Sequence, residues 1–463
     1  MKLLYTVYDF MWGDLITIPL PGGGSLGLSL LVLILVPAGI FFTLRTRFLP
    51  VRLFPEMLRI TLETENKAKR EGISGFQALI VSTATRVGMG NLVGVVAAIS
   101  AGGAGAVFWM WVTALVGSAT AFIEATLAQL YKQKDPLYGG YRGGPAYFIH
   151  SFMTRHFGKK TRRWSLTAVL FAVSGLICWC GISQVIGNSV SSSMYNAFHI
   201  PPLYTAIALV AVSAVIVLRK NATVKVLDVV VPIMAGCYFF ITLFIIIRNA
   251  SLLPSVFQRI FAEAFGLRQA AAGGFGAVIM NGVKRGLFSN EAGSGSAPCA
   301  AAAADIDHPA KEGLLQAFGV FIDTIVICSC TAMIMLLTPA ERVQGLAGMD
   351  LLQAAMEYHL GAFGVVFIAL ILWLFSFSTF IGILFYARSN VAYLFGDNWV
   401  SQTVYKVLAL VMLFIGGLAA YTFVWDLGDV GIGLMTIFNI AVILPMSREA
   451  LNCLREYETL RKR

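Results

Sequence analysis

Long apolar runs separated by short polar stretches make up most of the chain. Many runs reach the roughly 18 to 20 residues that cross a bilayer as a helix, and they are continuous rather than alternating, which excludes the strands of a membrane barrel. The pattern predicts an all-α integral membrane protein with about eleven transmembrane helices, after a short amphipathic segment, over residues 25–44, 74–100, 106–130, 165–195, 203–219, 226–247, 271–302, 314–337, 361–387, 402–422 and 429–447.

The composition agrees with this pattern. Hydrophobic residues make up 58% of the 463 residues and charged residues only 13%, whereas an average soluble domain is about 25% charged. The net charge of +10 does not indicate a nucleic-acid partner, because basic residues beside membrane spans are the ordinary signal of topology. The lipid bilayer is the expected surrounding.

The basic residues also predict the orientation of the chain, since cytoplasmic loops collect Lys and Arg. With the loop 45–73 placed inside, most of the 34 basic residues fall on the inside, and the outside receives only Lys2, Arg248, Arg259, Arg268 and Arg342. Three basic residues lie within spans, namely Arg86, Lys284 and Arg285. The N-terminus is therefore expected outside and the C-terminus in the cytoplasm.

Ten helices remain when the first is set aside, and they divide into five and five. An odd number of spans in a repeat inverts the second half relative to the first. We therefore expect four segments: an N-terminal segment with the extra helix and a cytoplasmic linker, two five-helix repeats of opposite orientation, and a basic cytoplasmic tail, over residues 1–73, 74–250, 251–447 and 448–463.

The opening helices of the two halves, 74–100 and 271–302, are also the two most disrupted by glycine and charge. Each has a basic residue shortly before a glycine, and an asparagine four or five residues further on. Interrupted helices at matching positions in two halves indicate a transporter's binding site. Close packing of helices through small residues is the alternative explanation.

An interrupted helix at mid-membrane leaves amide and carbonyl groups that hydrocarbon cannot satisfy. The half-helix after Gly90 presents partly positive amides, which suit a carboxylate. Carbonyls between Ala84 and Val87 face the other way and suit an ammonium group or Na⁺. A small amino acid satisfies both sets at once, so it is the expected ligand.

Three segments resemble the signature segments of the alanine or glycine:cation symporter family, the sodium:alanine symporters of bacteria and archaea. They are KRGLFSNEAGSGSAP, RVGMGNLVG and GGPAYFI, at residues 284–298, 86–94 and 143–149. The likeness covers essentially the full chain, and residues 87–91 also resemble the unwound first helix of the leucine-transporter fold. The resemblance implies that fold and sodium-coupled uptake of alanine or glycine across the cytoplasmic membrane.

The resemblance also implies roles for particular residues. The amides of Met89 and Gly90 are expected to bind the substrate carboxylate, and carbonyls near Thr85 and Arg86 the amino group. The substrate site as a whole is expected to comprise Thr85, Arg86, Gly88, Met89, Gly90, Asn91, Met280 and Asn281. Sodium is expected to be bound by the carbonyls of Ala84 and Val87 and the hydroxyls of Ser378 and Thr379. Because Arg86 stands where the leucine-type transporter has a small residue, a second sodium site is left open.

Acidic residues in or at the edges of spans are functional candidates, since buried charge is costly. They are Glu124, Asp228, Glu291, Asp323, Asp426 and Asp429. The directions of the two interrupted helices place Arg86 and Glu291 on the same cytoplasmic side of the site, and buried opposite charges are expected to pair. This predicts an Arg86–Glu291 gate that closes the cytoplasmic side.

The sequence favours a transporter over an enzyme or a channel. An enzyme needs a nucleophile and base or a metal constellation such as HExxH, and the sequence contains neither pattern. A channel does not need a pair of interrupted helices, and proton coupling through one of the acids remains an alternative to sodium. Apart from sodium as the coupling ion, no cofactor is expected, and the sequence does not indicate the oligomeric state.

Overall fold

The computed structural model describes residues 2–20, 24–63, 72–157, 163–219, 223–266 and 274–461. Eight helices in this part of the chain are long and apolar enough to cross a membrane. They are α5–η2–α6 (Gly75–Gly102), α7 (Gly105–Leu130), α9 (Leu166–Phe198), α11 (Thr223–Arg248), α15–η4–α16 (Pro309–Leu336), α19 (Ala362–Phe395), α20 (Trp399–Leu418) and α21 (Tyr421–Arg461). The chain is therefore a multi-pass helical membrane protein.

Shorter elements connect and cover these spans. Two of them, α2 (Leu30–Arg45) and α10 (Pro202–Val217), are apolar along their length. The others are α1 (Lys2–Trp12), β1 (Asp14–Leu20), β2 (Gly24–Ser29), α3 (Leu49–Arg52), α4 (Phe54–Leu62), β3 (Gln133–Lys134), β4 (Tyr141–Arg142), α8 (Pro145–Phe157), η3 (Ala250–Leu252), α12 (Leu253–Ala264), α13 (Gly274–Asn290), α14 (Pro298–Ala301), α17 (Ala340–Val343) and α18 (Gly348–Leu360).

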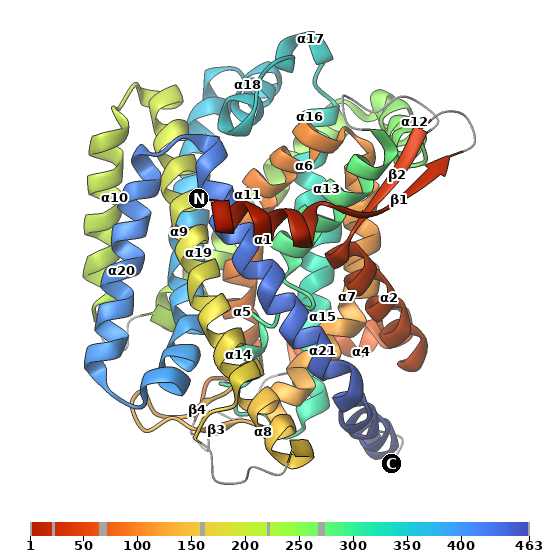
Figure 1. The fold of residues 1–463 in the computed structure, drawn as a ribbon. Helices are drawn as coiled ribbons and strands as arrows, with labels where there is room; N and C mark the ends of the chain where they lie inside the picture. The colour runs from red at the N-terminus through yellow and green to blue at the C-terminus, as the bar shows by residue number, and fades with distance from the viewer. Residues whose placement is uncertain are drawn as a thin grey trace.

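The helices form an elongated bundle (Figure 1). Helix α9 lies beside α19, α20 and α21, and α7 packs against α13 and α15. Helix α1 runs across the bundle rather than along it, and contacts α21. The interrupted helices, α5–η2–α6 and α13, lie within this bundle, where η2 contacts both α13 and α19.

The N-terminal segment differs from the prediction. A β-hairpin of β1 and β2 precedes α2, with Ile18 opposite Leu26, so the expected helix over 25–44 begins inside a strand. The β-branched residues of β1 favour an extended chain over a helix. Ser29 then starts α2, because its hydroxyl accepts a hydrogen bond from the Val32 amide at 3.3 Å.

The C-terminal segment also differs from the prediction. Helix α21 continues to Arg461, so most of the expected tail over 448–463 extends the last span. Its far end is held to α4, because the Tyr457 hydroxyl donates to Glu56 at 2.5 Å and Arg461 pairs with the same carboxylate at 3.2 Å. Residues 462–463, and residues 64–71 of the predicted cytoplasmic linker, lie outside the described residues.

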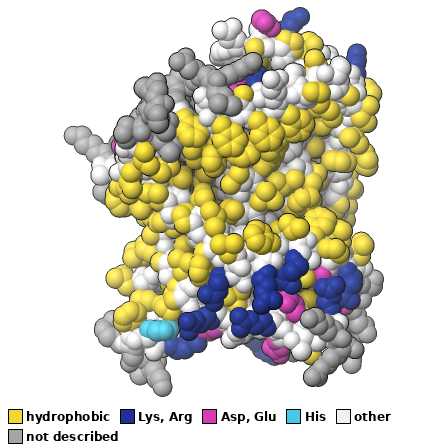
Figure 2. Space-filling model, turned by 90° about the vertical axis from the view of Figure 1, so that its right-hand side faces the viewer, with side chains coloured by type: hydrophobic (Ala, Val, Ile, Leu, Met, Phe, Trp, Pro, Cys, Tyr) yellow, Lys and Arg dark blue, Asp and Glu magenta, His cyan; other side chains and the backbone are white. Residues whose placement is uncertain are grey.

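One end of the molecule is rich in charge. Figure 2 shows a broad apolar surface with Lys and Arg side chains gathered below it. We call this lower end the basic end; it carries α8, β3, β4 and the end of α21 (Figure 1). The opposite end carries α12, α17 and α18.

Candidate functional site

The first interruption lies between α5 and α6, where the sequence analysis placed it. Helix α5 begins with a capping box, in which Ser74 and Gln77 bind each other's backbone amides. The helical geometry is lost at Val87 and Gly88, whose φ and ψ angles are −75° and 72°, and −152° and −135°. This part of the helix is fully buried.

Side chains satisfy the backbone groups that this interruption exposes. The Gly88 amide donates to the Asn91 side-chain oxygen at 3.1 Å, and the Met89 amide donates to the Thr379 hydroxyl at 3.2 Å. Gly88 must be a glycine, because a Cβ there would lie 2.0 Å from the Thr379 oxygen. The first interruption is thus fitted closely against α19.

Three of the predicted sodium ligands lie together beside this interruption. The Thr379 hydroxyl donates to the Ala84 carbonyl at 3.3 Å, and the Ser378 hydroxyl lies 3.4 Å from the same carbonyl while donating to the Phe375 carbonyl of its own helix at 2.9 Å. All three residues are buried, and the fourth predicted ligand, Val87, lies in the interruption itself. Oxygen atoms in such a cluster are the ligands that hard cations prefer.

The second interruption follows α13 and occupies residues 291–297. Glu291 has a positive φ of 58°, and Gly293 and Gly295 have φ values of 95° and 82°, which favour glycine. The interruption is held by a carboxylate on α7: the Gly293 amide donates to Glu124 at 3.2 Å, and Asn439 donates to Glu124 at 2.8 Å and to the Gly293 carbonyl at 3.0 Å.

Two predicted substrate residues do not lie at this interruption. Met280 and Asn281 are in the continuous part of α13, where the Asn281 side chain donates to the Ala277 carbonyl of its own helix at 2.9 Å. Asn281 is nine residues from Asn290, or about 13 Å along the helix. The prediction placed the interruption too early, because Gly286 packs against Thr113 inside a regular helix.

The two interrupted helices meet at Asp323 of η4. Its carboxylate accepts hydrogen bonds from the side-chain nitrogen of Asn91 at 2.7 Å and from the Ser289 hydroxyl at 2.9 Å. Gly90 lies against the same turn of α13, since a Cβ there would be 3.2 Å from the Ser289 Cα. The sequence analysis singled out Asp323 as a buried acid but missed Ser289, because only the fold brings these residues together.

The predicted contact between Arg86 and Glu291 does not form in this conformation. Arg86 is fully buried and donates to the Gln316 carbonyl at 3.2 Å, and it has no ion-pair partner among the described residues. Glu291 instead accepts from the Tyr386 hydroxyl at 3.1 Å, and the Thr85 hydroxyl lies 3.3 Å from the same carboxylate. Thr85 and Tyr386 are also bonded to each other at 2.6 Å.

This arrangement has a local cause. The Arg86 side chain lies in the space beside Gly319, where a Cβ would be 2.6 Å from the guanidinium. Glu291 leaves the end of α13 with positive φ, and its carboxylate lies at α19. A bridge of hydroxyls and one carboxylate, formed by Thr85, Tyr386 and Glu291, therefore joins α5, α19 and the second interruption. We call it the hydroxyl bridge.

Lys284 and Arg285 bind the same acid. Lys284 Nζ lies 2.6 Å from Asp429 Oδ2, and Arg285 makes two hydrogen bonds to the Asp429 carboxylate, at 3.1 and 3.2 Å. The exposed fractions of the three side chains are 5%, 9% and 1%. Helix α1 covers them, since Lys284 also donates to the Tyr8 hydroxyl at 2.5 Å and Trp12 donates to the Asp429 carbonyl at 3.0 Å.

Two aromatic rings lie between these charges and the first interruption. The Arg285 guanidinium lies 4.0 Å from the ring centre of Trp425, and Trp425 packs on Phe288 with ring centres 5.0 Å apart. Phe288 in turn lies beside Gly90. We call Lys284, Arg285, Asp429 and these two rings the charged cover.

Interrupted helices that meet inside a membrane bundle are typical of secondary transporters. The bundle has a leucine-transporter-like fold. It is similar to MhsT in complex with L-phenylalanine, with a TM-score of 0.56, 11% identity, and 83% of this chain and 89% of that chain covered. It is also similar to a variant manganese transporter of Eremococcus coleocola, with a TM-score of 0.51, 14% identity, and 84% and 81% covered.

The chain belongs to the sodium:alanine symporter family, which it matches over residues 23–463. It is 41% identical to the probable sodium/glutamine symporter GlnT of Bacillus subtilis, covering 94% of this chain and 89% of that protein. It is 33% identical to the sodium/alanine symporter AgcS of Methanococcus maripaludis, covering 100% and 98%. The predicted family is thus confirmed, and the chain is a transporter rather than an enzyme.

Gly88→Ala should abolish amino-acid uptake while the protein still reaches the membrane. The added methyl group would displace the Thr379 hydroxyl from the Ala84 carbonyl and the Met89 amide. Uptake and membrane abundance should be measured together. Gly236→Ala is the matched control, because nothing lies within 4 Å of its Cβ position; equal uptake by both variants would contradict the assignment.

Asp429→Asn should destabilise the purified protein, because it leaves two buried cations beside a neutral amide. Breaking a buried ion pair costs about 3–5 kcal/mol. The midpoint of thermal unfolding in detergent is the measurement. Asp307→Asn makes the same chemical change at a side chain that is 70% exposed, and an equal effect of both changes would show that the charged cover does not stabilise the fold.

Proposed function

We propose that this protein is a sodium-coupled symporter that carries a small neutral amino acid, alanine or glycine, into the cytoplasm. The observation that carries the proposal is the convergence of the Ala84 carbonyl with the Ser378 and Thr379 hydroxyls beside the interruption at Val87 and Gly88. Sodium would replace these mutual hydrogen bonds with bonds to the ion. The relatives, which include a sodium/alanine symporter, support the same coupling.

The substrate would lie next to this ion, between the two interruptions. Its carboxylate would bind the amides of Met89 and Gly90, at the start of the second half of the first interrupted helix. The Met89 amide now donates to Thr379, so binding would exchange that bond for one to the substrate. Phe288 would border the substrate, because its Cδ1 lies 3.8 Å from the position of a Cβ on Gly90.

Inward transport requires that the basic end faces the cytoplasm, and the positive-inside rule supports this orientation. In this orientation the C-terminus would lie inside, in the cytoplasmic membrane of a bacterium or archaeon. We further propose that the spans comprise the extra helix α2 and ten helices in two inverted repeats. The matching interruptions in α5–η2–α6 and after α13 support this division.

Alternating access then needs one closure on each side of the site. The hydroxyl bridge would be the cytoplasmic closure, because it joins α5 to α19 on the side of the interruption nearer the start of α5. The charged cover would be the outer closure, and α1 would hold it shut. Both are formed here, so this conformation corresponds to the closed state between the two open ones.

Proton coupling is the second candidate. Glu124, Glu291 and Asp323 are fully or almost fully buried, and none has an ion-pair partner within 4 Å among the described residues. A buried carboxyl without a cation is a natural proton carrier. One relative, 35% identical and covering 86% of this chain, is a sodium/proton-dependent alanine carrier protein of Bacillus sp. strain PS3.

The deciding experiment is uptake of labelled alanine into proteoliposomes under imposed gradients. An inward sodium gradient at equal pH should drive accumulation above equilibrium, and a proton gradient without sodium should not. Accumulation driven by protons alone would favour the second candidate, and equilibration without accumulation would indicate a channel. Competition with glycine and glutamine would rank the substrates.

Removing both hydroxyls, with Ser378→Ala and Thr379→Val, should raise the sodium concentration for half-maximal uptake by at least about tenfold, since a lost ion ligand costs more than about 1.4 kcal/mol. Ser376→Ala is the control, because Ser376 is a buried serine on the same helix that is not a predicted ligand. An unchanged sodium dependence in the double variant would place the ion elsewhere.

A further inference from the structure

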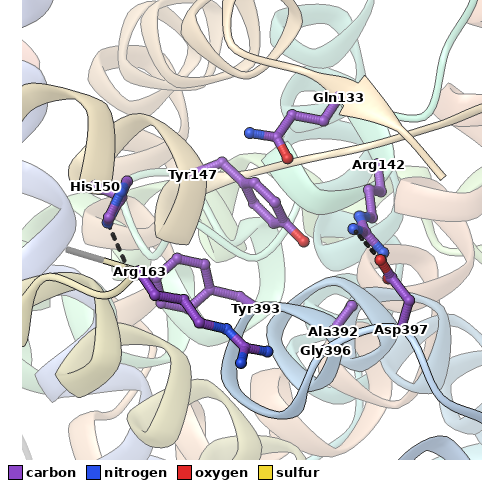
Figure 3. A pocket seen from close by; sticks show the side chains of 9 residues that line it. All are labelled: Gln133, Arg142, Tyr147, His150, Arg163, Ala392, Tyr393, Gly396 and Asp397. Atoms are coloured by element: carbon purple, nitrogen blue, oxygen red, sulfur yellow. Dashed lines mark hydrogen bonds and ion pairs between the residues drawn. The ribbon is translucent and has the colours of Figure 1, made fainter. Parts of the chain in front are cut away.

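A cavity of about 240 Å³ lies at the basic end, between α8 and the end of α19 (Figure 3). Most of the side chains around it are polar, and they come from β3, β4, α8 and α19 and the segments next to them. They are Gln133, Arg142, Tyr147, His150, Arg163, Ala392, Tyr393, Gly396 and Asp397. The cavity lies apart from the interruptions and belongs to no site described above.

The cavity carries an excess of positive charge. Arg142 pairs with Asp397, with Nη2 3.1 Å from Oδ2, and lies 3.9 Å from Asp135; its buried Nε has no hydrogen-bond partner among the described residues. Arg163 has no acidic partner within 4 Å among those residues, and its guanidinium lies against Gly396. Burial lowers the pKa of His150, so the two arginines supply the charge. Arg163 is therefore the lining cation without an acidic partner among the described residues.

The surroundings of the cavity are typical of a membrane interface. Trp164, Leu166 and Phe395 flank its lining residues and are 45%, 74% and 60% exposed. In the sequence, Lys159, Lys160 and Arg162 come directly before Arg163, at the start of a membrane span. Basic clusters next to spans bind anionic lipid headgroups. Apolar side chains beside the cavity give the acyl chains of such a lipid a surface to contact.

We propose that this cavity binds the phosphate group of an anionic phospholipid, through Arg163 and Arg142. A bound phosphate would tie α8 more firmly to α19. The two are already joined, since the Tyr147 hydroxyl donates to the Ser389 carbonyl at 3.2 Å and the Tyr393 hydroxyl bonds His150 at 3.0 Å. Because α19 also carries Ser378 and Thr379, the lipid would regulate transport through this helix.

The test measures lipid binding, which depends neither on the direction of transport nor on its coupling. The purified full-length protein is equilibrated with vesicles of mixed phosphatidylglycerol and phosphatidylcholine, and the retained lipids are counted by native mass spectrometry. Arg163→Gln should reduce the preference for phosphatidylglycerol about fivefold, as expected for the loss of about one surface charge. Ala392→Leu should reduce it as well, because it fills the cavity without changing charge.

Arg45→Gln is the matched control, since Arg45 is the last residue of α2, lies over the Phe41 ring and does not line the cavity. Its preference for phosphatidylglycerol should equal that of the unchanged protein. Equal losses in the Arg45 and Arg163 variants would mean general attraction to the surface and would overturn the site. Displacement of the lipid by excess inorganic phosphate would instead assign the cavity to a soluble phosphate compound.

Discussion

The need to satisfy backbone groups inside the membrane governs this structure. Each interrupted helix exposes amides and carbonyls that lipid cannot bind. The first interruption satisfies them with Asn91 and Thr379, and the second with Glu124 and Asn439. Each of these partners except Asn91 comes from another helix, so the interruptions fix how α7, α19 and α21 pack around the centre.

These partners are also the groups that a ligand would engage. Thr379 bonds both the Ala84 carbonyl and the Met89 amide, so an ion at Ala84 would take the hydroxyl oxygen that the Met89 amide now binds. Binding of the two ligands would therefore be linked: an ion that takes Thr379 frees the amide for the substrate. This linkage provides a physical basis for coupled transport, in which either ligand alone leaves bonds unmade.

The sequence predicted what depends on local chemistry. Glycines flanking Met89 located the first interruption, and the apolar runs located most spans. It placed the second interruption too early, because a basic pair followed by Gly286 resembles the first. In the structure, Lys284 and Arg285 both bind Asp429, more than a hundred residues away. The hairpin of β1 and β2 was missed because its residues continue the apolar run of α2.

Contacts between distant elements were harder to predict. Arg86 and Glu291 are expected on one side of the site, yet their contact depends on which other groups each side chain can bind. Tyr386 and Thr85 supply hydroxyls to Glu291, and Gly319 leaves space for Arg86 elsewhere. Nothing near Glu291 in the sequence indicates Tyr386. Contact between the two charges in another conformation stays a prediction from the sequence.

The linkage between ion and substrate is tested most directly by equilibrium binding of labelled alanine to the purified protein, first in sodium and then in potassium at the same ionic strength. The account predicts that replacing sodium raises the dissociation constant at least about tenfold, which is about 1.4 kcal/mol of coupling. The same affinity in both salts would show that the Thr379 hydroxyl does not link the two sites, and would contradict the account.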